Sequence, residues 1–243
     1  MRNILLKIRF LGTEYHGFQS QKNASAIQNV LEEVLFSLTG EKITVTGCSR
    51  TDAGVHAEEF CLNFKTESQL GERNFIKGMN SRLPNDISVF SACEVPEDFN
   101  ARYSAVLKEY KYLIYNSEER NPFYENRALH YNRRIDDELL NNCCKEFLGT
   151  HDFAAFCSAG SEVLTTERTI ESCSVKRYGD LVEFKVCGNG FLYNMVRIMV
   201  GTLLEINEGK ISPEIGKIIE SKNRSEAGLT APPYGLYLNK VIY

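Results

Sequence analysis

Both halves of the sequence carry the same order of elements: a strand, an amphipathic helix, paired strands and a further helix. Strands joined by short turns pair antiparallel, and helices placed among such hairpins cover the resulting sheet. We therefore expect an α+β fold of two similar halves, each a largely antiparallel sheet backed by helices, with a cleft between them. The divide falls near residue 100, which gives an N-terminal half of 1–100 and a C-terminal half of 101–243.

Apolar periodicity predicts the elements of the first half. After an N-terminal strand, a helical apolar stripe begins at Ile27, with Ser25 and Gln28 as a capping box and Gly40 as the residue that ends the helix. Strands are expected at 42–47, 60–65 and 86–95, and a shorter helix at 74–83.

The second half repeats this scheme. Its strands are expected at 108–116, in a hairpin over 167–188, and at 235–243. Its helices are expected at 136–149, 191–207 and 212–221. Gly179 and Asp180 form the predicted hairpin turn, Asp136 and Ser212 are the predicted N-caps of two helices, and Pro213 suits a first helical position.

Arg50 and Asp52 lie in the loop between two strands of the first half, followed by Ala53 and Gly54. A guanidinium beside a carboxylate favours the ionised aspartate, and a positioned carboxylate can act as a nucleophile or a base. The small residues leave space for a substrate ring, and glycine permits backbone angles closed to other residues. The same residue types also form ordinary turns and surface ion pairs. His56, taken alone, is expected to be structural or exposed.

The composition indicates a globular cytosolic protein. No apolar run is long enough to span a bilayer, and the charged N-terminal segment is typical of a strand, not of a signal peptide. The eight cysteines show no CxxC spacing and the four histidines no paired ligand spacing, so we expect reduced core cysteines and no metal. The net charge of −4 is unusual for a protein that binds nucleic acid, although an acidic chain can carry a basic cleft.

The segment RTDAGVHA at 50–57 resembles the signature of the TruA-type tRNA pseudouridine synthases. Further segments resemble that family in the same order: GFQSQ at 17–21, NSRLPNDI at 80–87, FNARYSAVLKEYKYLIYN at 99–116, NGFLYNMVRIMVGTLLEI at 189–206 and APPYGLYL at 231–238. The resemblance spans nearly the whole chain and implies the pseudouridine synthase fold.

The resemblance also implies an isomerisation in which the uracil N1–C1′ bond breaks, the base rotates and C5 joins C1′. The family's essential aspartate corresponds to Asp52, which would act on a flipped-out uridine by attacking C1′ or the base, or by deprotonating the sugar. Retaining glycosidases form a comparable glycosyl ester with the help of a second, acidic carboxylate. Uracil leaves as a delocalised anion, so one carboxylate can suffice, and neither a metal nor a cofactor is expected.

The family's active-site tyrosine corresponds to Tyr110. In an alternating strand Lys108, Tyr110 and Tyr112 share one face, and Tyr110 could stack on the extruded base. Such stacking is worth roughly 1–3 kcal/mol and would help to offset the cost of unstacking. Without the resemblance, these tyrosines are better interpreted as ordinary strand residues packed on a helix.

Four cations complete the candidate substrate-binding residues. Arg50 would hold Asp52 or contact the RNA near it. Arg197 lies on an apolar helix, where a charge needs a partner: a carboxylate if the role is structural, or an active-site group if it is functional. Arg102 and Lys108 are candidates for phosphate contacts.

The resemblance implies a cytoplasmic homodimer that modifies uridines 38, 39 and 40 in the anticodon arm of tRNA, with one tRNA contacting both subunits. A dimer would join two modest basic clefts into one longer path. Two other classes remain as alternatives: a non-catalytic RNA-binding module, for which we find no RNP1-like pattern, and a glycosidase, for which no second carboxylate suggests itself.

Overall fold

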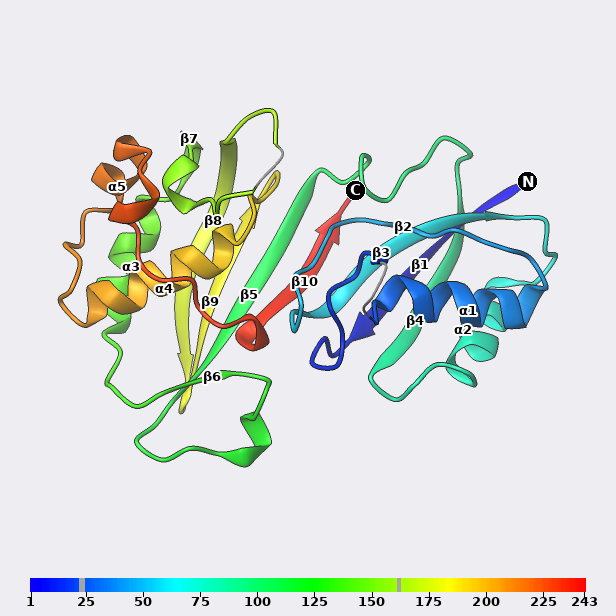
Figure 1. Ribbon diagram of the computed structural model, residues 1–243, viewed down its shortest axis with the longest axis horizontal. Coiled ribbons are helices and arrows are strands. Elements are labelled where there is room, and N and C mark those ends of the chain that lie inside the picture. The colour runs from blue at the N-terminus through cyan, green and yellow to red at the C-terminus, as the bar shows by residue number, and fades with distance from the viewer. Residues whose placement is uncertain (22–24, 161–162) are drawn as a thin grey trace. The chain divides into compact units, whose positions relative to one another are not determined.

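The computed structural model describes residues 1–21, 25–160 and 163–243, and the chain divides into two compact units (Figure 1). Unit 1 comprises Met1–Val106 together with Tyr237–Tyr243, and unit 2 comprises Leu107–Leu236. The sequence-based division at residue 100 assigned the closing strand to the second half, whereas that strand pairs with the first unit through Tyr237 and His56.

Unit 1 is a sheet with the strand order β4-β1-β3-β10, and β2 also pairs with β3. Its strands are β1 (Arg2–Phe10), β2 (Thr46–Gly47), β3 (His56–Thr66), β4 (Ile87–Val95) and β10 (Leu236–Ile242). β1 runs antiparallel to β3 and β4, and β10 runs parallel to β3. The register sets Leu6 opposite Leu62 and Ile8 opposite Phe60, so apolar residues of the neighbouring strands β1 and β3 meet on one face of the sheet.

Two helices of unit 1, α1 (Ile27–Thr39) and α2 (Glu72–Asn80), contact each other, and α2 packs on β4. Phe75 of α2 meets Phe64 of β3 edge to face, with ring centroids 5.7 Å apart. Both side chains are buried, which makes this pair part of the core of the unit.

Unit 2 has the strand order β5-β9-β8-β7, with β6 pairing parallel to β5. Its strands are β5 (Leu107–Asn116), β6 (Leu129–Tyr131), β7 (Gly149–Asp152), β8 (Glu167–Tyr178) and β9 (Leu181–Gly188). Its helices are α3 (Asp137–Lys145), α4 (Met195–Asn207) and α5 (Ile215–Ser221). α3 packs on β8 and on α4, while α4 also contacts β5, so buried helix faces cover the sheet.

The predicted α+β class and the largely antiparallel pairing are confirmed. Several local predictions also hold. The Asp136 carboxylate accepts a hydrogen bond from the Leu139 N–H at 3.0 Å as the N-cap of α3. Gly40 ends α1 in the left-handed region at φ 77°, and residues 179 and 180 connect β8 to β9.

Two predicted N-caps are wrong. The N-cap of α1 is Ala26 and not Ser25, because the Gln28 side-chain oxygen accepts from the Ser20 backbone N–H at 3.0 Å. The N-cap of α5 is Glu214 and not Ser212, whose hydroxyl donates to the Glu214 carboxylate at 3.0 Å. In each case a side chain expected to take part in the cap, Gln28 or Ser212, has another polar partner.

Three predicted elements are shorter than expected. The helix predicted over 136–149 ends at Lys145, and Gly149 begins β7. Of the strand predicted over 42–47, only Thr46–Gly47 pairs with β3, since the Val45 N–H donates to the Glu32 carboxylate at 3.1 Å. The helix predicted from 191 begins at Met195, because Asn194 occupies the left-handed region at φ 60°. The strands β6 and β7 were not predicted.

None of the helices within the described ranges has the length and apolarity needed to cross a membrane.

Candidate active site around the Asp52 loop

Asp52 lies in the loop that joins β2 to β3 in unit 1. Its side chain is half-buried, and its backbone carbonyl accepts from the Val55 N–H at 3.2 Å, which closes a tight turn. Gly54 within the turn has φ 78°, a left-handed conformation that favours glycine. Ala53 is exposed, so no bulky side chain follows the carboxylate. The turn therefore fixes the backbone that carries the Asp52 carboxylate, and the two residues that follow it are small.

A second loop, residues 11–18 after β1, lies directly against the backbone of the Asp52 loop. The Gly54 N–H donates to the Tyr15 carbonyl at 3.2 Å. A β-carbon at Gly12 would come within 2.0 Å of the Val55 carbonyl oxygen. The two loops therefore approach each other more closely than any side chain would allow.

Tyr15 fixes the second loop from its other side. Its hydroxyl donates to the Asp86 carboxylate at 2.9 Å, and the tyrosine is buried. Burial, together with the hydrogen bond to Asp86, raises the pKa of Tyr15 to about 12, so the hydroxyl keeps its proton at neutral pH.

His56 begins β3 directly after the Asp52 loop and is 0% exposed. Its Nδ1 accepts from the Gly12 N–H at 2.8 Å. Its ring lies against that of Tyr237 in β10, with centroids 4.7 Å apart. The sequence alone suggested a structural or exposed residue, and His56 is in fact fully buried beside the loop.

Arg50 and Thr51 precede Asp52 and differ in their surroundings. The Arg50 side chain is exposed, two residues from the half-buried Asp52. The Thr51 hydroxyl is buried, and among the described residues it has no hydrogen-bond partner. A buried hydroxyl without a hydrogen-bond partner lowers the free energy of unfolding, so Thr51 destabilises this loop.

Arg102 also belongs to unit 1 and lies on an exposed turn between β4 and β5. Asn100 accepts hydrogen bonds from the backbone N–H groups of Arg102 and Tyr103 at 2.9 and 3.2 Å. The Arg102 guanidinium lies 5.5 Å from the ring centroid of Tyr103, whose side chain is 79% exposed. Tyr103 was not singled out from the sequence; an exposed aromatic ring beside an arginine is a pair of side chains on which bases can stack.

Tyr110 and Lys108 lie on β5 of unit 2. Tyr110 stands opposite Val186 of β9, is 7% exposed, and meets Phe191 edge to face at 5.1 Å. Lys108 is half-buried. Tyr112 on the same face is buried and donates its hydroxyl proton to the Pro232 carbonyl at 2.8 Å, and burial raises its pKa. Tyr112 therefore behaves as a packed strand residue.

Arg197 lies in the first turn of α4, also in unit 2. Its Nε donates to the Ala231 carbonyl at 2.7 Å, and its Nη1 donates to the Asn194 side-chain oxygen at 2.8 Å. The Ala231 N–H in turn donates to the Arg197 carbonyl at 3.1 Å. These bonds hold the residue against the 227–231 segment and orient its guanidinium.

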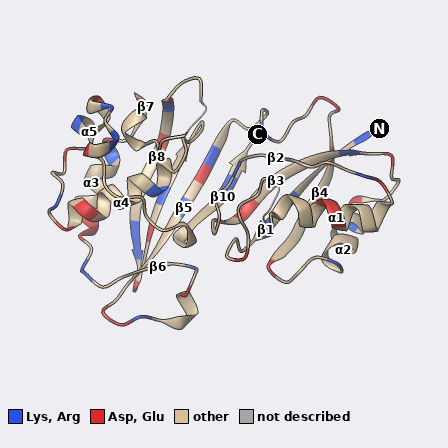
Figure 2. Cartoon of the chain, in the orientation of Figure 1, with Lys and Arg blue, Asp and Glu red and all other residues tan. Residues whose placement is uncertain are grey.

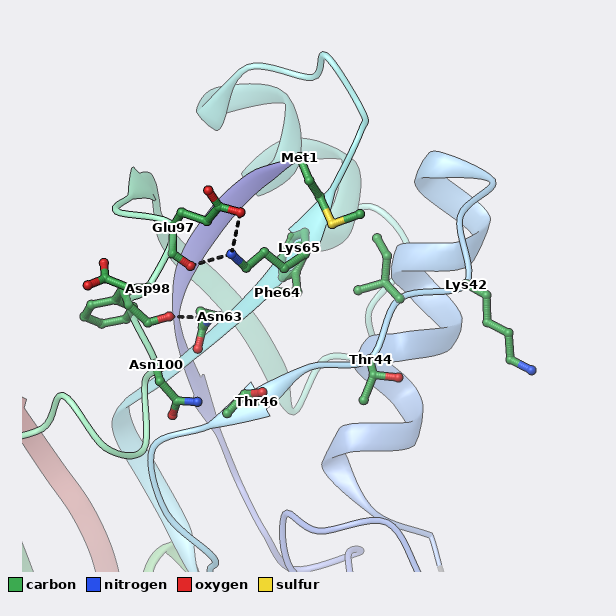
Figure 3. Close-up of a pocket in the computed structure, with 12 residues that line it drawn as sticks. Met1, Lys42, Thr44, Thr46, Asn63, Phe64, Lys65, Glu97, Asp98 and Asn100 are labelled. Atoms are coloured by element: carbon green, nitrogen blue, oxygen red, sulfur yellow. Dashed lines mark hydrogen bonds and ion pairs between the residues drawn. The ribbon is translucent and has the colours of Figure 1, made fainter.

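A surface cavity of about 470 Å³ lies elsewhere in unit 1, beside the far end of β3 (Figure 3). Asn63 and Phe64 line it, together with Lys65, which forms a hydrogen bond to the Glu97 carbonyl and lies 3.8 Å from the Glu97 carboxylate. Neither Arg50 nor Asp52 lines this cavity. Two lysines, Lys42 and Lys65, line this cavity, but Glu97 and Asp98 line it as well, so it lacks the excess of positive charge that a strong anion site needs.

Charges of both signs are interspersed within each unit (Figure 2). Within the described part of the chain, no group of three or more histidine, cysteine or acidic side chains is arranged to hold a metal ion. The cysteines are free thiols, and Cys48, Cys61, Cys143, Cys144 and Cys187 are buried.

Comparison with known proteins gives one consistent result. The family described as tRNA pseudouridine synthase matches residues 7–104 and 143–243. Proteins named tRNA pseudouridine synthase A are 48% identical in Acetivibrio thermocellus, 46% in Caldicellulosiruptor bescii and 44% in Clostridium acetobutylicum, each over 100% of both chains. The family match includes Asp52, Arg102 and Arg197, whereas Lys108 and Tyr110 fall between its two stretches.

Proposed function

The chain belongs to the tRNA pseudouridine synthase family, and from this premise we propose that it converts uridines 38, 39 and 40 of the tRNA anticodon arm to pseudouridine, with Asp52 as the nucleophile. As a member of the family it is an isomerase that acts on tRNA. The geometry of the Asp52 loop is the observation that carries the assignment of the catalytic residue.

The reaction needs a group that acts on the sugar or the base while the N1–C1′ bond breaks and that is regenerated when the C5–C1′ bond forms. Attack by the Asp52 carboxylate breaks the N1–C1′ bond and lets uracil depart as an anion. After rotation, C5 joins C1′ and the carboxylate leaves. The proton on C5 then passes to solvent and N1 takes up a proton, so the product is an isomer of the starting uridine. The half-buried carboxylate, the exposed Ala53 and the turn at Gly54 support this role, since they leave room for a nucleotide flipped out of its stack.

We further propose that Tyr110 stacks on the extruded uracil, with a contribution of roughly 1–3 kcal/mol. Tyr110 is only 7% exposed, so its contact with a base requires its surroundings to open. Arg50 and Arg197 orient the reacting groups, and Arg102 and Lys108 bind phosphates. The exposure of Arg50 and Arg102 supports contact with RNA.

The proposed enzyme works in the cytoplasm as a homodimer that binds one tRNA with both subunits. A dimer would join the modest basic regions of two copies into one longer path along the RNA, which would offset the net charge of −4 on each chain.

Tritium release from tRNA carrying uracil tritiated at C5 tests the proposal. Isomerisation releases tritium into water, glycosidic hydrolysis frees uracil instead, and binding alone releases nothing. Asp52→Asn should abolish release while tRNA binding and folding persist. Asp98→Asn, which changes an exposed aspartate of the same unit, serves as the control and should retain full activity.

Normal turnover by Asp52→Asn would show that the nucleophile is misassigned. Sequencing of tRNA after the reaction identifies the modified uridines, and pseudouridine outside positions 38–40 would reject the proposed substrate site. A uridine deuterated at C2′ shows whether Asp52 acts as a nucleophile or as a general base. Only deprotonation of the sugar breaks the C2′–D bond.

A further inference from the structure

We propose that His56 is a positioning residue for the Asp52 loop: its unprotonated Nδ1 holds the Gly12 N–H, and Gly12 in turn fixes the backbone that carries Asp52. The inference rests on the proposed role of Asp52. It assigns to His56 a task distinct from filling space in the core.

The first step is the hydrogen bond itself. The Gly12 N–H donates to His56 Nδ1 at 2.8 Å, in a place where His56 is 0% exposed. A backbone N–H can only donate, so Nδ1 must carry a lone pair and the imidazole must be neutral at that nitrogen. An apolar side chain of similar size would fill the space and leave a buried N–H without an acceptor.

The second step is the contact from Gly12 to the Asp52 loop. The Cα of Gly12 lies so close to Val55 that an added β-carbon would come within 2.0 Å of the Val55 carbonyl oxygen. Val55 closes the turn through its N–H, which donates to the Asp52 carbonyl at 3.2 Å. A shift of Gly12 is therefore transmitted directly to the turn that carries Asp52.

The third step is the orientation of the imidazole. Its ring lies against Tyr237 of β10 with centroids 4.7 Å apart and an interplanar angle of 40°. Tyr237 is also the register partner of His56 in the parallel pairing of β10 with β3. The ring is thus held by a packed strand, which keeps Nδ1 aimed at Gly12.

Three variants of His56 separate this role from simple packing. In His56→Asn the side-chain oxygen can take the place of Nδ1, in His56→Gln the acceptor lies one bond farther out, and in His56→Leu no acceptor remains. Phe75→Leu changes a buried residue of the same unit that contacts Phe64, outside the loop, and serves as the control for lost stability. Three quantities are measured: kcat at saturating tRNA, the Kd for tRNA, and the exchange rate of the Gly12 amide hydrogen.

We expect His56→Leu and His56→Gln to lower kcat about ten- to a hundredfold, with little change in the Kd for tRNA, and to speed exchange at the Gly12 amide. His56→Asn should keep kcat and the exchange rate of the Gly12 amide close to those of the unmodified protein. Phe75→Leu should lower the melting temperature without altering kcat. A folded His56→Leu enzyme with normal kcat would overturn the inference, as would His56→Asn failing to restore kcat although the Gly12 amide stays protected. If Asp52→Asn proves active, the role of Asp52 fails separately, while the Gly12 exchange data still report on the hydrogen bond.

Discussion

Gly17 lies so close to Thr51 that a β-carbon at Gly17 would come within 2.1 Å of the Thr51 carbonyl oxygen. Gly17 also has φ 85°, in the left-handed region. The loop of residues 11–18 therefore requires glycine here for two separate reasons. Because Thr51 directly precedes Asp52, this contact links the shape of one loop to the position of the proposed nucleophile.

Gly17→Ala should lower stability by about 1–2 kcal/mol through its backbone angle and by a further 1–3 kcal/mol through the clash. Gly40→Ala is the matched control, since Gly40 has φ 77° and open space around its Cα, and it should show only the first loss. Urea unfolding measures both changes. Equal losses in the two variants would mean that the loop yields freely and that the contact with Thr51 does not constrain it.

Thr51→Val should raise stability by about 1 kcal/mol, because it removes a buried hydroxyl that has no partner within the described residues. Thr202→Val provides a contrast of opposite sign. The Thr202 hydroxyl donates to the Ile198 carbonyl at 2.8 Å and accepts from the Gly228 N–H at 2.9 Å, so its loss should destabilise the protein by about 1–3 kcal/mol. Thermal unfolding of both variants checks these signs, and a destabilised Thr51→Val would contradict the prediction.

Gly201→Ala should destabilise the protein by about 2 kcal/mol or more, although alanine normally favours a helix by about 1 kcal/mol. A β-carbon at Gly201 in α4 would come within 1.7 Å of the Leu229 carbonyl oxygen. Gly216→Ala in α5 is the comparison, because its β-carbon would meet no backbone atom and would come no nearer than 3.3 Å to the exposed Glu146 side chain, which accepts from the Gly216 N–H. Chemical denaturation should show the two substitutions moving in opposite directions.

Glu208→Gln should weaken the protein at neutral pH and have less effect in acid. Hydrogen bonding to Lys210 lowers the pKa of Glu208, with further help from Tyr131 and Arg133, which lie 3.1 and 2.9 Å from its carboxylate oxygens. A lowered folded pKa gives stability that is fully present above the unfolded value of about 4.3 and disappears as the pH falls through the folded value. Urea unfolding of both proteins between neutral and acidic pH measures the difference, and the exposed Glu119→Gln serves as the control. A difference that stays constant with pH would contradict this origin.

Local signals were sufficient where a residue interacts with its near neighbours in sequence. Asp136 caps α3 through Leu139, and the Gly179–Asp180 turn joins two consecutive strands. Local signals failed where a distant group competes. The Glu32 carboxylate accepts from Val45 and draws that segment away from β3, which no alternating pattern encodes.

The candidate site likewise contains residues that local sequence signals reveal and contacts that they do not. Arg50 and Asp52 could be singled out because they lie two residues apart in one motif. The contacts that hold their loop join Gly12 and Gly17 to residues about forty positions later, and only the folded chain reveals them. Glycines at 12 and 17 are a weak sequence signal by themselves, since glycine occurs in many turns.

The pairing of Tyr237 with His56 affects the order of events during synthesis. The ribosome makes residues 107–236 before it reaches the segment that completes the first sheet, so the nascent N-terminal portion must wait with the edge of β3 beside His56 uncovered. Maturation of the Asp52 loop is thereby delayed until almost the entire polypeptide has emerged. A message truncated before codon 237 should yield a protein in which the later unit folds and the earlier one remains incomplete.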